Sequence, residues 1–278
     1  MFKEERVKIV NIDLPSPCNL NCEFCYLPKT EGILNPDDLE EIIKGFSNAQ
    51  IFNLGGGEPF LNNNLISVIE YIESLGDKRM VITTNATHIP EKILELPEKT
   101  RNKITIQVSL PAGNSRVYKD ITEKDEFDSV LQNTKELKKH YNTIINKAVY
   151  QKNYESLDGI LKIAQEMEII ARINLAIPVG KGKNIKIINE KQLKKLKSFL
   201  LVKKALGFAI ESPLLSTSKD NCTINGCIAL ESFYNLKKEA LCFADFGIKA
   251  YIDPDGNKFD CEYLAYSTNN ILAGAENG

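Results

Sequence analysis

The chain has 278 residues, of which 43% are apolar and 26% are charged, and its formal net charge is −2. This balance is ordinary for a globular protein, with no basic excess for nucleic acid and no polybasic stretch for a membrane surface. No apolar run approaches the ~18 residues of a membrane-spanning helix, and the charged N-terminus lacks the apolar core of a signal peptide, so we expect a cytoplasmic protein.

Short β-type runs alternate with amphipathic helical segments along most of the chain. The predicted strands are residues 7–14, 51–54, 79–84, 103–110, 143–150 and 171–177. A helix is predicted after each strand from apolar residues at helical spacing, as in Leu39, Ile43 and Phe46. Because strands alternate with helices, we expect an α/β fold with a parallel sheet and right-handed crossovers.

Local signals mark several helix boundaries. Asn35 is predicted as an N-cap with Pro36 at the first helical position, and Gly76 lies where a helix C-terminal glycine belongs. We expect the lysine run of the last predicted helix to be a solvated face; it comprises Lys194, Lys195, Lys197, Lys203 and Lys204.

Chemically distinctive residues follow the predicted strands at the points where these strands end. In parallel α/β folds, ligands bind at the carboxyl ends of the strands. A sheet that curls into a barrel would therefore bring the strand-end segments to one site. These segments are the first cysteine loop, the glycine run at 55–59, Thr84 with Asn85, Ser109 with Leu110, and residues 178–180.

The seven cysteines fall into two groups, three between positions 18 and 25 and four between 222 and 261. An odd number in a cytoplasmic protein does not indicate a disulfide framework, and generic buried cysteines would scatter along the chain. The grouping therefore indicates two metal or cluster sites.

The first group, Cys18, Cys22 and Cys25, lies within eight residues. Three thiolates from one loop can ligate three irons of a [4Fe-4S] cubane and leave the fourth iron open to a substrate. Two alternatives stay open at this point: a zinc site, although the usual paired spacings are missing, and inert core cysteines.

This CxxxCxxC loop after a first β-strand resembles the radical S-adenosylmethionine (SAM) superfamily, and the resemblance covers roughly residues 7–200. It implies a partial (β/α)6 TIM-like barrel over residues 1–205. It also implies that Cys18, Cys22 and Cys25 are catalytic, because their [4Fe-4S] cluster binds SAM through its open iron.

The strand-end motifs extend this resemblance. Residues 55–59 resemble the family's glycine-glycine-glutamate-proline motif, residues 84–86 its threonine-asparagine-glycine segment, and residues 178–182 a segment that passes near the adenine. The cofactor-binding residues implied are Phe24, Tyr26, Gly56, Gly57, Glu58, Asn85, Ser109 and Pro178. Ordinary turn chemistry is the alternative for Asn85 and Ser109.

One stretch departs from the family pattern. Many relatives have an arginine-glycine pair after the fourth strand, where this chain has residues 118–122, a tyrosine-lysine-aspartate-isoleucine-threonine run. Arg116 precedes this run and is a candidate cation for the SAM carboxylate.

The chemistry implied by the resemblance is reductive cleavage of SAM to methionine and a 5′-deoxyadenosyl radical, which takes a hydrogen atom from the substrate. The cofactors carry the difficult step, so the protein has to position the substrate and exclude solvent. We expect an apolar barrel interior for this task, lined by Val81, Ile106, Val108 and Ile173. A low-potential electron donor, flavodoxin or ferredoxin, is the implied partner.

The second group comprises Cys222, Cys227, Cys242 and Cys261. Asp255-Gly256 predicts a hairpin turn between β-runs at 248–252 and 257–260, just before the last of these cysteines. This region resembles the small C-terminal domain of the SPASM and twitch subfamilies. The resemblance implies a domain over residues 206–278 with one auxiliary [4Fe-4S] cluster; a four-cysteine zinc site is the alternative.

Within this subfamily, the first hypothesis is a radical SAM enzyme that modifies a peptide or protein. Only about six residues precede the first strand, so we expect no leader-recognition domain at the N-terminus. This weakens the peptide assignment unless a separate partner recognises the leader. The second hypothesis is an enzyme of cofactor or small-metabolite biosynthesis. The third is a non-catalytic iron–sulfur electron carrier.

Overall fold

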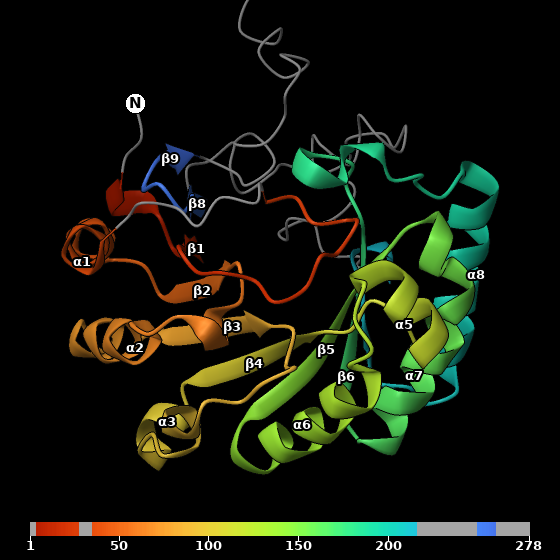
Figure 1. Ribbon diagram of the computed structural model, residues 1–278, viewed down its shortest axis with the longest axis horizontal. Helices are drawn as coiled ribbons and strands as arrows, with labels where there is room; N and C mark the ends of the chain where they lie inside the picture. The colour runs from red at the N-terminus through yellow and green to blue at the C-terminus, as the bar shows by residue number, and fades with distance from the viewer. Residues whose placement is uncertain (1–3, 28–34, 216–248, 260–278) are drawn as a thin grey trace, which may run out of the picture.

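The computed structural model describes residues 4–27, 35–215 and 249–259, and its strands form one curved sheet (Figure 1). Six of the strands alternate with helices, as expected from the sequence. Their bounds are β1 Ile9–Leu14, β2 Ile51–Gly56, β3 Arg79–Thr84, β4 Ile104–Ser109, β5 Asn142–Val149 and β6 Ile170–Leu175. Each lies within two residues of its predicted start and end.

The sheet has nine strands in the described residues, in the order β7-β6-β5-β4-β3-β2-β1-β8-β9. All neighbouring pairs from β7 to β8 are parallel, and β8 with β9 forms an antiparallel hairpin. The three further strands are β7 Ile210–Glu211, β8 Lys249–Ile252 and β9 Lys258–Phe259. The predicted hairpin is thus confirmed, and β8 extends the sheet by pairing beside β1. The boundary predicted between residues 205 and 206 stays a prediction.

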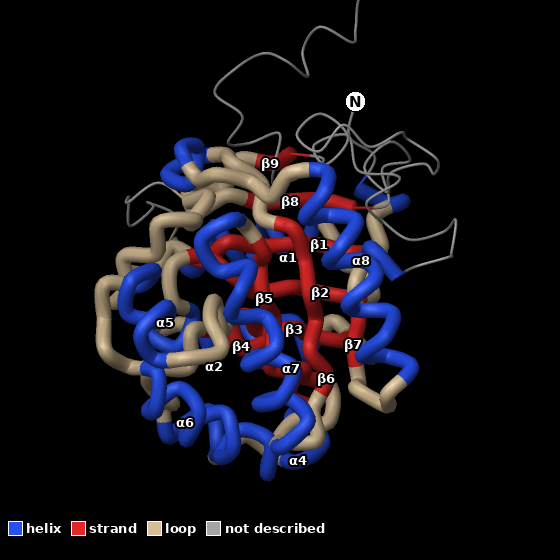
Figure 2. Tube along the Cα trace, turned by 90° about the vertical axis from the view of Figure 1, so that its right-hand side faces the viewer, coloured by secondary structure: helices blue, strands red, loops and turns tan. Residues whose placement is uncertain are grey.

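Helices cover the outer side of the curved sheet (Figure 2). The α-helices are α1 Pro36–Gly45, α2 Leu65–Ser74, α3 Glu91–Leu94, α4 Glu98–Arg101, α5 Ser115–Thr122, α6 Phe127–His140, α7 Leu157–Glu166 and α8 Glu190–Ala205. Within the described ranges there are also five short 3₁₀ turns: η1 Glu4–Arg6, η2 Pro59–Leu61, η3 Gln151–Ser156, η4 Gly180–Asn184 and η5 Pro213–Leu215. None of the described helices is long and apolar enough to cross a membrane.

The predicted helix boundaries at Asn35 and Gly76 are confirmed. The Asn35 side chain accepts a hydrogen bond from the Asp38 amide at 2.9 Å, with Pro36 opening α1. Gly76 follows α2 with a φ of 114° and donates its amide to the Glu73 carbonyl at 3.1 Å. A positive φ of this kind is adopted readily by glycine, which explains the residue found there.

Helix α5 was not predicted from the sequence. It has only eight residues, too few for the apolar spacing to stand out. Its start is fixed locally, because the Asn114 side chain accepts a hydrogen bond from the Val117 amide at 3.0 Å. The stretch that departs from the family pattern is therefore the second half of a helix.

The expected apolar lining of the barrel is wrong at three of its four positions. Ile106, Val108 and Ile173 are buried to within 1% and belong to the core between the sheet and the outer helices. Side chains alternate between the two faces of a strand, so the interior is lined instead by their neighbours, such as Gln107 and Arg172. Val81 lies on the interior face, as predicted.

A lysine is buried within the outer core. Lys147 of β5 is 0% exposed, and its ammonium donates to the Pro111 carbonyl at 2.7 Å and to the Ser156 hydroxyl at 3.3 Å. Burial lowers the pKa of Lys147 from 10.5 to about 7. Above that pH the folded chain holds an uncharged amine, while the unfolded chain still binds the proton.

We expect Lys147→Met to remove a pH dependence of folding. Between pH 7 and about 10 the unfolded state of the native chain binds more protons, so its stability should rise with pH through that window. Across this window, the increase in the free energy of unfolding should be smaller in the variant by up to ~4 kcal/mol. Urea unfolding at both ends of the window measures it, with the exposed Lys191→Met as control. If the free energy of unfolding changed equally with pH in the Lys147→Met and Lys191→Met variants, Lys147 would not be the source of the pH dependence.

Candidate active site

The three cysteines of the first group lie in the loop that leaves β1, and all are free thiols. Cys18 is exposed, and Cys22 and Cys25 are partly buried. All three line one cavity of about 540 Å³ at the carboxyl ends of the strands, together with Gly56 and Gly57. The first cysteine group and the glycine run therefore meet, as expected from their positions after β1 and β2.

The arrangement of the thiols suits a cluster better than a single ion. Among the described residues, no three His, Cys, Asp or Glu side chains are placed to hold one metal ion. A cubane requires something different, because each cysteine binds a different iron of the cluster. The described residues therefore offer no preformed site for a single zinc ion at this loop, and the [4Fe-4S] cluster on the three cysteines stays a prediction.

The surroundings of the thiols also fit a bound cationic cluster. Burial, and after it the neighbouring Cys25 and Cys18 sulfurs, raise the pKa of Cys22 to about 12. Burial also raises the pKa of Cys25. Three thiolates this close need added positive charge, which iron supplies when the ligands lose their protons. In addition, the buried hydroxyl of Tyr118 has no hydrogen-bond partner among the described residues, and burial, followed by the Cys22 charge, raises its pKa.

Four backbone hydrogen bonds connect the cysteine loop to three other elements. Two come from the end of α5, one from η4 and one from the turn after β2. The bonds are Asn21 N to Thr122 O at 3.1 Å, Glu23 N to Ile121 O at 3.2 Å, Gly182 N to Cys25 O at 2.7 Å, and Glu58 N to Pro17 O at 3.0 Å. The helix that the sequence did not reveal is thus part of the site.

Gly56 and Gly57 allow the turn after β2 to pack directly on the chain before Cys18. A Cβ atom at Gly56 would lie 2.3 Å from the Leu14 carbonyl oxygen, and one at Gly57 would lie 2.0 Å from that of Ser16. Gly56 also has a φ of 115°. The close backbone approach expected of these glycines is therefore made first to the cysteine loop itself.

Glu58 joins the ends of β2 and β3. It is 2% exposed, and its carboxylate accepts hydrogen bonds from the Phe60 amide at 3.0 Å, the Thr84 hydroxyl at 2.5 Å and the Asn85 amide at 2.7 Å. Burial raises its pKa to about 7, against these three donors. The bonds give Glu58 the loop-shaping position expected from the sequence. Glu58 is not among the residues that line the cavity.

Asn85 reaches the cysteine loop through a side-chain bond. Its amide nitrogen donates to the Asn19 side-chain oxygen at 2.9 Å, and Asn19 donates in turn to the Thr87 hydroxyl at 2.7 Å. The next residue, Ala86, has a φ of 54°, in the left-handed region that favours glycine. The alanine that replaces the family's glycine therefore keeps the glycine conformation at some cost in strain.

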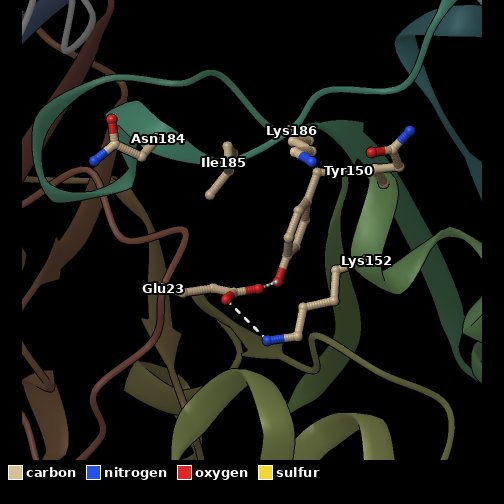
Figure 3. Close-up of a pocket in the computed structure, with 7 residues that line it drawn as sticks. Glu23, Tyr150, Lys152, Asn184, Ile185 and Lys186 are labelled. Atoms are coloured by element: carbon tan, nitrogen blue, oxygen red, sulfur yellow. Dashed lines mark hydrogen bonds and ion pairs between the residues drawn. The ribbon is translucent and has the colours of Figure 1, made fainter.

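A second, smaller pocket lies behind the loop, between Glu23 and residues from η3 and η4 (Figure 3). Figure 3 shows the Glu23 carboxylate between two donors, the Tyr150 hydroxyl at 2.6 Å and the Lys152 ammonium at 2.9 Å. The adjacent Phe24 ring packs near the Tyr150 ring, with their centroids 5.8 Å apart. These contacts fix the segment between Cys22 and Cys25, so the pocket has an anchoring role.

The aromatic residue after Cys25 points the opposite way, into the barrel. Tyr26 donates its hydroxyl to both carboxylate oxygens of Asp13, at 3.0 and 2.9 Å. Tyr251 of β8 donates to the same carboxylate at 2.6 Å. Asp13 is 3% exposed, so this buried carboxylate connects β1, the cysteine loop and the C-terminal hairpin.

Other predicted site residues lie near the cavity or apart from it. Ser109 ends β4 on the interior face, and Pro178 begins the segment that packs on the cysteine loop; neither lines the cavity. Arg116 is exposed on α5 and does not line it either. The cations that do line it are Lys124 and Lys181, and the Lys181 ammonium donates to the Asn21 side chain. Sequence reasoning missed Lys181, although it falls inside the noted 178–182 segment.

The four cysteines of the second group, Cys222, Cys227, Cys242 and Cys261, lie outside the described residues. Their assignment to an auxiliary cluster therefore stays a prediction.

Comparison with protein families gives one match. The model of the radical SAM superfamily matches residues 16–164, more than half of the chain, and this range contains the three cysteines and the glycine run.

Among curated proteins, similar sequences are named GTP 3′,8-cyclase. The probable enzyme of Sulfurisphaera tokodaii is 28% identical over 194 residues, which cover 66% of this chain and 61% of the relative. The enzyme of Aquifex aeolicus is 33% identical over 144 residues, 47% of this chain and 45% of the relative. This chain thus spans about three fifths of the first relative's length and less than half of the second's.

Among solved structures, similar folds are found in two proteins determined with bound peptides. Streptococcus suis SuiB bound to precursor peptide SuiA has a TM-score of 0.75 and 19% identity, covering 95% of this chain and 62% of that chain. Native anSMEcpe with bound AdoMet and the Cp18Cys peptide has a TM-score of 0.66 and 19% identity, covering 92% and 74%. At this identity the likeness shows a shared fold.

Proposed function

The chain belongs to the radical SAM superfamily, and from this premise we propose that it cleaves SAM reductively and uses the resulting radical to take a hydrogen atom from a peptide or protein. The observation that carries the proposal is the cavity lined by Cys18, Cys22 and Cys25, with Gly56 and Gly57 at its edge. When bound, the cluster and SAM supply the electron transfer and the 5′-deoxyadenosyl radical.

The chain's own residues bind and orient these groups. The three thiolates ligate three irons, and the loop between them is fixed by Glu23, Tyr150 and Lys152. Free backbone groups at Gly56 and Gly57 are proposed to meet the amino group of SAM. Lys181 replaces Arg116 as the proposed partner of its carboxylate, because Lys181 lines the cavity.

The remaining predicted contacts complete the proposed SAM site. Asn85 contacts the cysteine loop through Asn19, and Ser109 ends β4 on the interior face. Pro178 begins the segment whose Gly180 and Gly182 pack on that loop. Phe24 and Tyr26 hold the loop from its two sides. The electron comes from a separate low-potential donor of the flavodoxin or ferredoxin type.

We also propose an auxiliary [4Fe-4S] cluster on Cys222, Cys227, Cys242 and Cys261, in a domain of the SPASM or twitch type at residues 206–278. The hairpin of β8 and β9 supports it, because this hairpin ends just before Cys261. The same hairpin supports the proposal of a peptide substrate, in line with the fold that the chain shares with SuiB and anSMEcpe. A second candidate substrate is a small molecule such as GTP, favoured by the names of the sequence relatives.

Anaerobic reconstitution tests the proposed chemistry. We expect about eight irons per chain, four for each [4Fe-4S] cluster, and slow formation of 5′-deoxyadenosine when SAM and dithionite are added. Cys222→Ala should lower the iron content toward four irons per chain and leave in place the cluster on Cys18, Cys22 and Cys25, which binds SAM. A protein that holds iron but never forms 5′-deoxyadenosine would be an electron carrier and would contradict the proposal.

A further inference from the structure

Lys181 is held against the cysteine loop through the residue that follows it, Gly182. The Gly182 amide donates a hydrogen bond to the Cys25 carbonyl at 2.7 Å. A Cβ atom at Gly182 would lie 2.7 Å from the Phe24 carbonyl oxygen, so the two backbones are in direct contact. This packing fixes the backbone of Lys181 beside the loop that carries the three thiols.

The side chain of Lys181 is anchored to the same loop. Its ammonium donates to the side-chain oxygen of Asn21, which lies between Cys18 and Cys22. The side-chain nitrogen of Asn21 donates in turn to the Glu123 carboxylate at 2.6 Å, which orients the amide with its oxygen toward Lys181. Lys181 thus lines the same cavity as the three cysteines, with its ammonium in a defined position.

The charge of Lys181 is not neutralised by a carboxylate. Within the described ranges its ammonium has the hydrogen bond to Asn21 and no ion pair. The side chain is partly buried, and solvent screens a partly buried charge less than an exposed one. Burial raises the pKa of Cys22 and of Cys25, and the Lys181 charge acts in the opposite direction on both. The ammonium therefore favours negative charge at these sulfurs.

A cation at this position also favours the reduced form of a cluster bound by the cysteines. Reduction adds an electron to the cluster and its thiolates, so their negative charge increases. A nearby ammonium stabilises the more negative state by the larger amount, because the attraction between charges grows with their size. The charge at a cluster is one of the properties that set its reduction potential. Lys181 is therefore expected to make the first cluster easier to reduce.

Resting on the proposed radical chemistry, we propose that the Lys181 ammonium sets the reduction potential of the first cluster, raising it so that a low-potential donor can deliver its electron. In this step the donor is oxidised by one electron and the cluster is reduced by one, and no bond is formed or broken. The effect belongs to the chain before SAM binds, so it is separate from the contact proposed between Lys181 and the SAM carboxylate.

A redox titration of the reconstituted full chain, carried out without SAM, tests this role. The first cluster is identified by the electron paramagnetic resonance signal that changes when SAM is added to a reduced sample. Lys181→Met should lower the ratio of reduced to oxidised cluster at a given potential about tenfold, which is a shift of ~59 mV for one electron. Lys181→Arg keeps the charge and should titrate like the native chain.

Lys183→Met is the matched control, because it removes the same charge from the same 3₁₀ turn, η4. Lys183 is exposed and does not line the cavity, so solvent screens its charge from the cluster. The control should shift the reduction potential by less than half as much as Lys181→Met. Iron content should stay native in all three variants.

The outcomes separate this role from the proposed function. An unchanged potential in Lys181→Met, an equal shift in Lys183→Met, or the same shift in Lys181→Arg overturns the role of the Lys181 charge. Loss of iron in Lys181→Met overturns it as well, because Lys181 would then be a structural support of the loop. A native chain whose first cluster is reduced but never forms 5′-deoxyadenosine from SAM overturns the proposed function and leaves the shift in potential standing.

Discussion

Replacing Cys22 with alanine is expected to abolish 5′-deoxyadenosine formation, with a loss of at least about a thousandfold, since SAM is not cleaved without the cluster's electron. Cys22 is the thiol whose pKa is raised most clearly, to about 12, so it depends on bound iron to become a thiolate. The iron content should fall by about four per chain. Iron analysis, the absorbance of the cluster and chromatography of 5′-deoxyadenosine measure these changes.

Cys222→Ala is the matched control for this experiment, because it also removes one thiol but from the second group. Its iron content should fall by a similar amount, while uncoupled SAM cleavage continues. If the two variants lost SAM cleavage equally, the division of the cysteines into a SAM site and an auxiliary site would be wrong.

The strands and the position of the site were accessible from the sequence because their signals are local. β-type runs between helical segments predicted six parallel strands, and the residues after them predicted where a ligand binds. The hairpin at Asp255-Gly256 follows from turn chemistry alone, and the structure contains it as β8 and β9. Its pairing with β1 depends on contacts between distant residues, which no local pattern reveals.

The interior of the barrel was misjudged because an alternating pattern does not say which face points outward. Ile106 and Gln107 alternate along β4, and the apolar set was assigned to the interior. Outer helices need an apolar surface to pack against, so the apolar set faces them. The polar set is left for the interior face of the sheet.

Supporting contacts around the cysteines were also beyond the sequence. Glu23 reads as an ordinary polar residue between two cysteines, yet Tyr150, 127 positions later, donates to it. Lys181 approaches Asn21 across a comparable separation. Such partners are set by how the barrel closes, and only the three-dimensional arrangement brings them together.

Gly180 has a role that the sequence motif did not suggest. It has a φ of 57°, and a Cβ atom there would lie 1.7 Å from the Tyr26 carbonyl oxygen. Tyr26 directly follows Cys25, so any side chain at position 180 must push the cysteine loop. The segment 178–182 therefore also needs a glycine at position 180, so that it can pack against the cysteine loop.

Gly180→Ala is expected to displace the loop and destabilise the protein by about 3 kcal/mol, from backbone strain plus overpacking. The first cluster should assemble incompletely, lowering both iron content and 5′-deoxyadenosine. Gly207→Ala is the matched control: its φ is 88°, but a Cβ atom there meets nothing within 4 Å, so only the strain of about 1–2 kcal/mol applies. Urea unfolding, iron analysis and 5′-deoxyadenosine yield compare the two. If both variants lost the same stability and both kept the cluster, Gly180 would be a turn residue alone, because its contact with Tyr26 is what distinguishes it from Gly207.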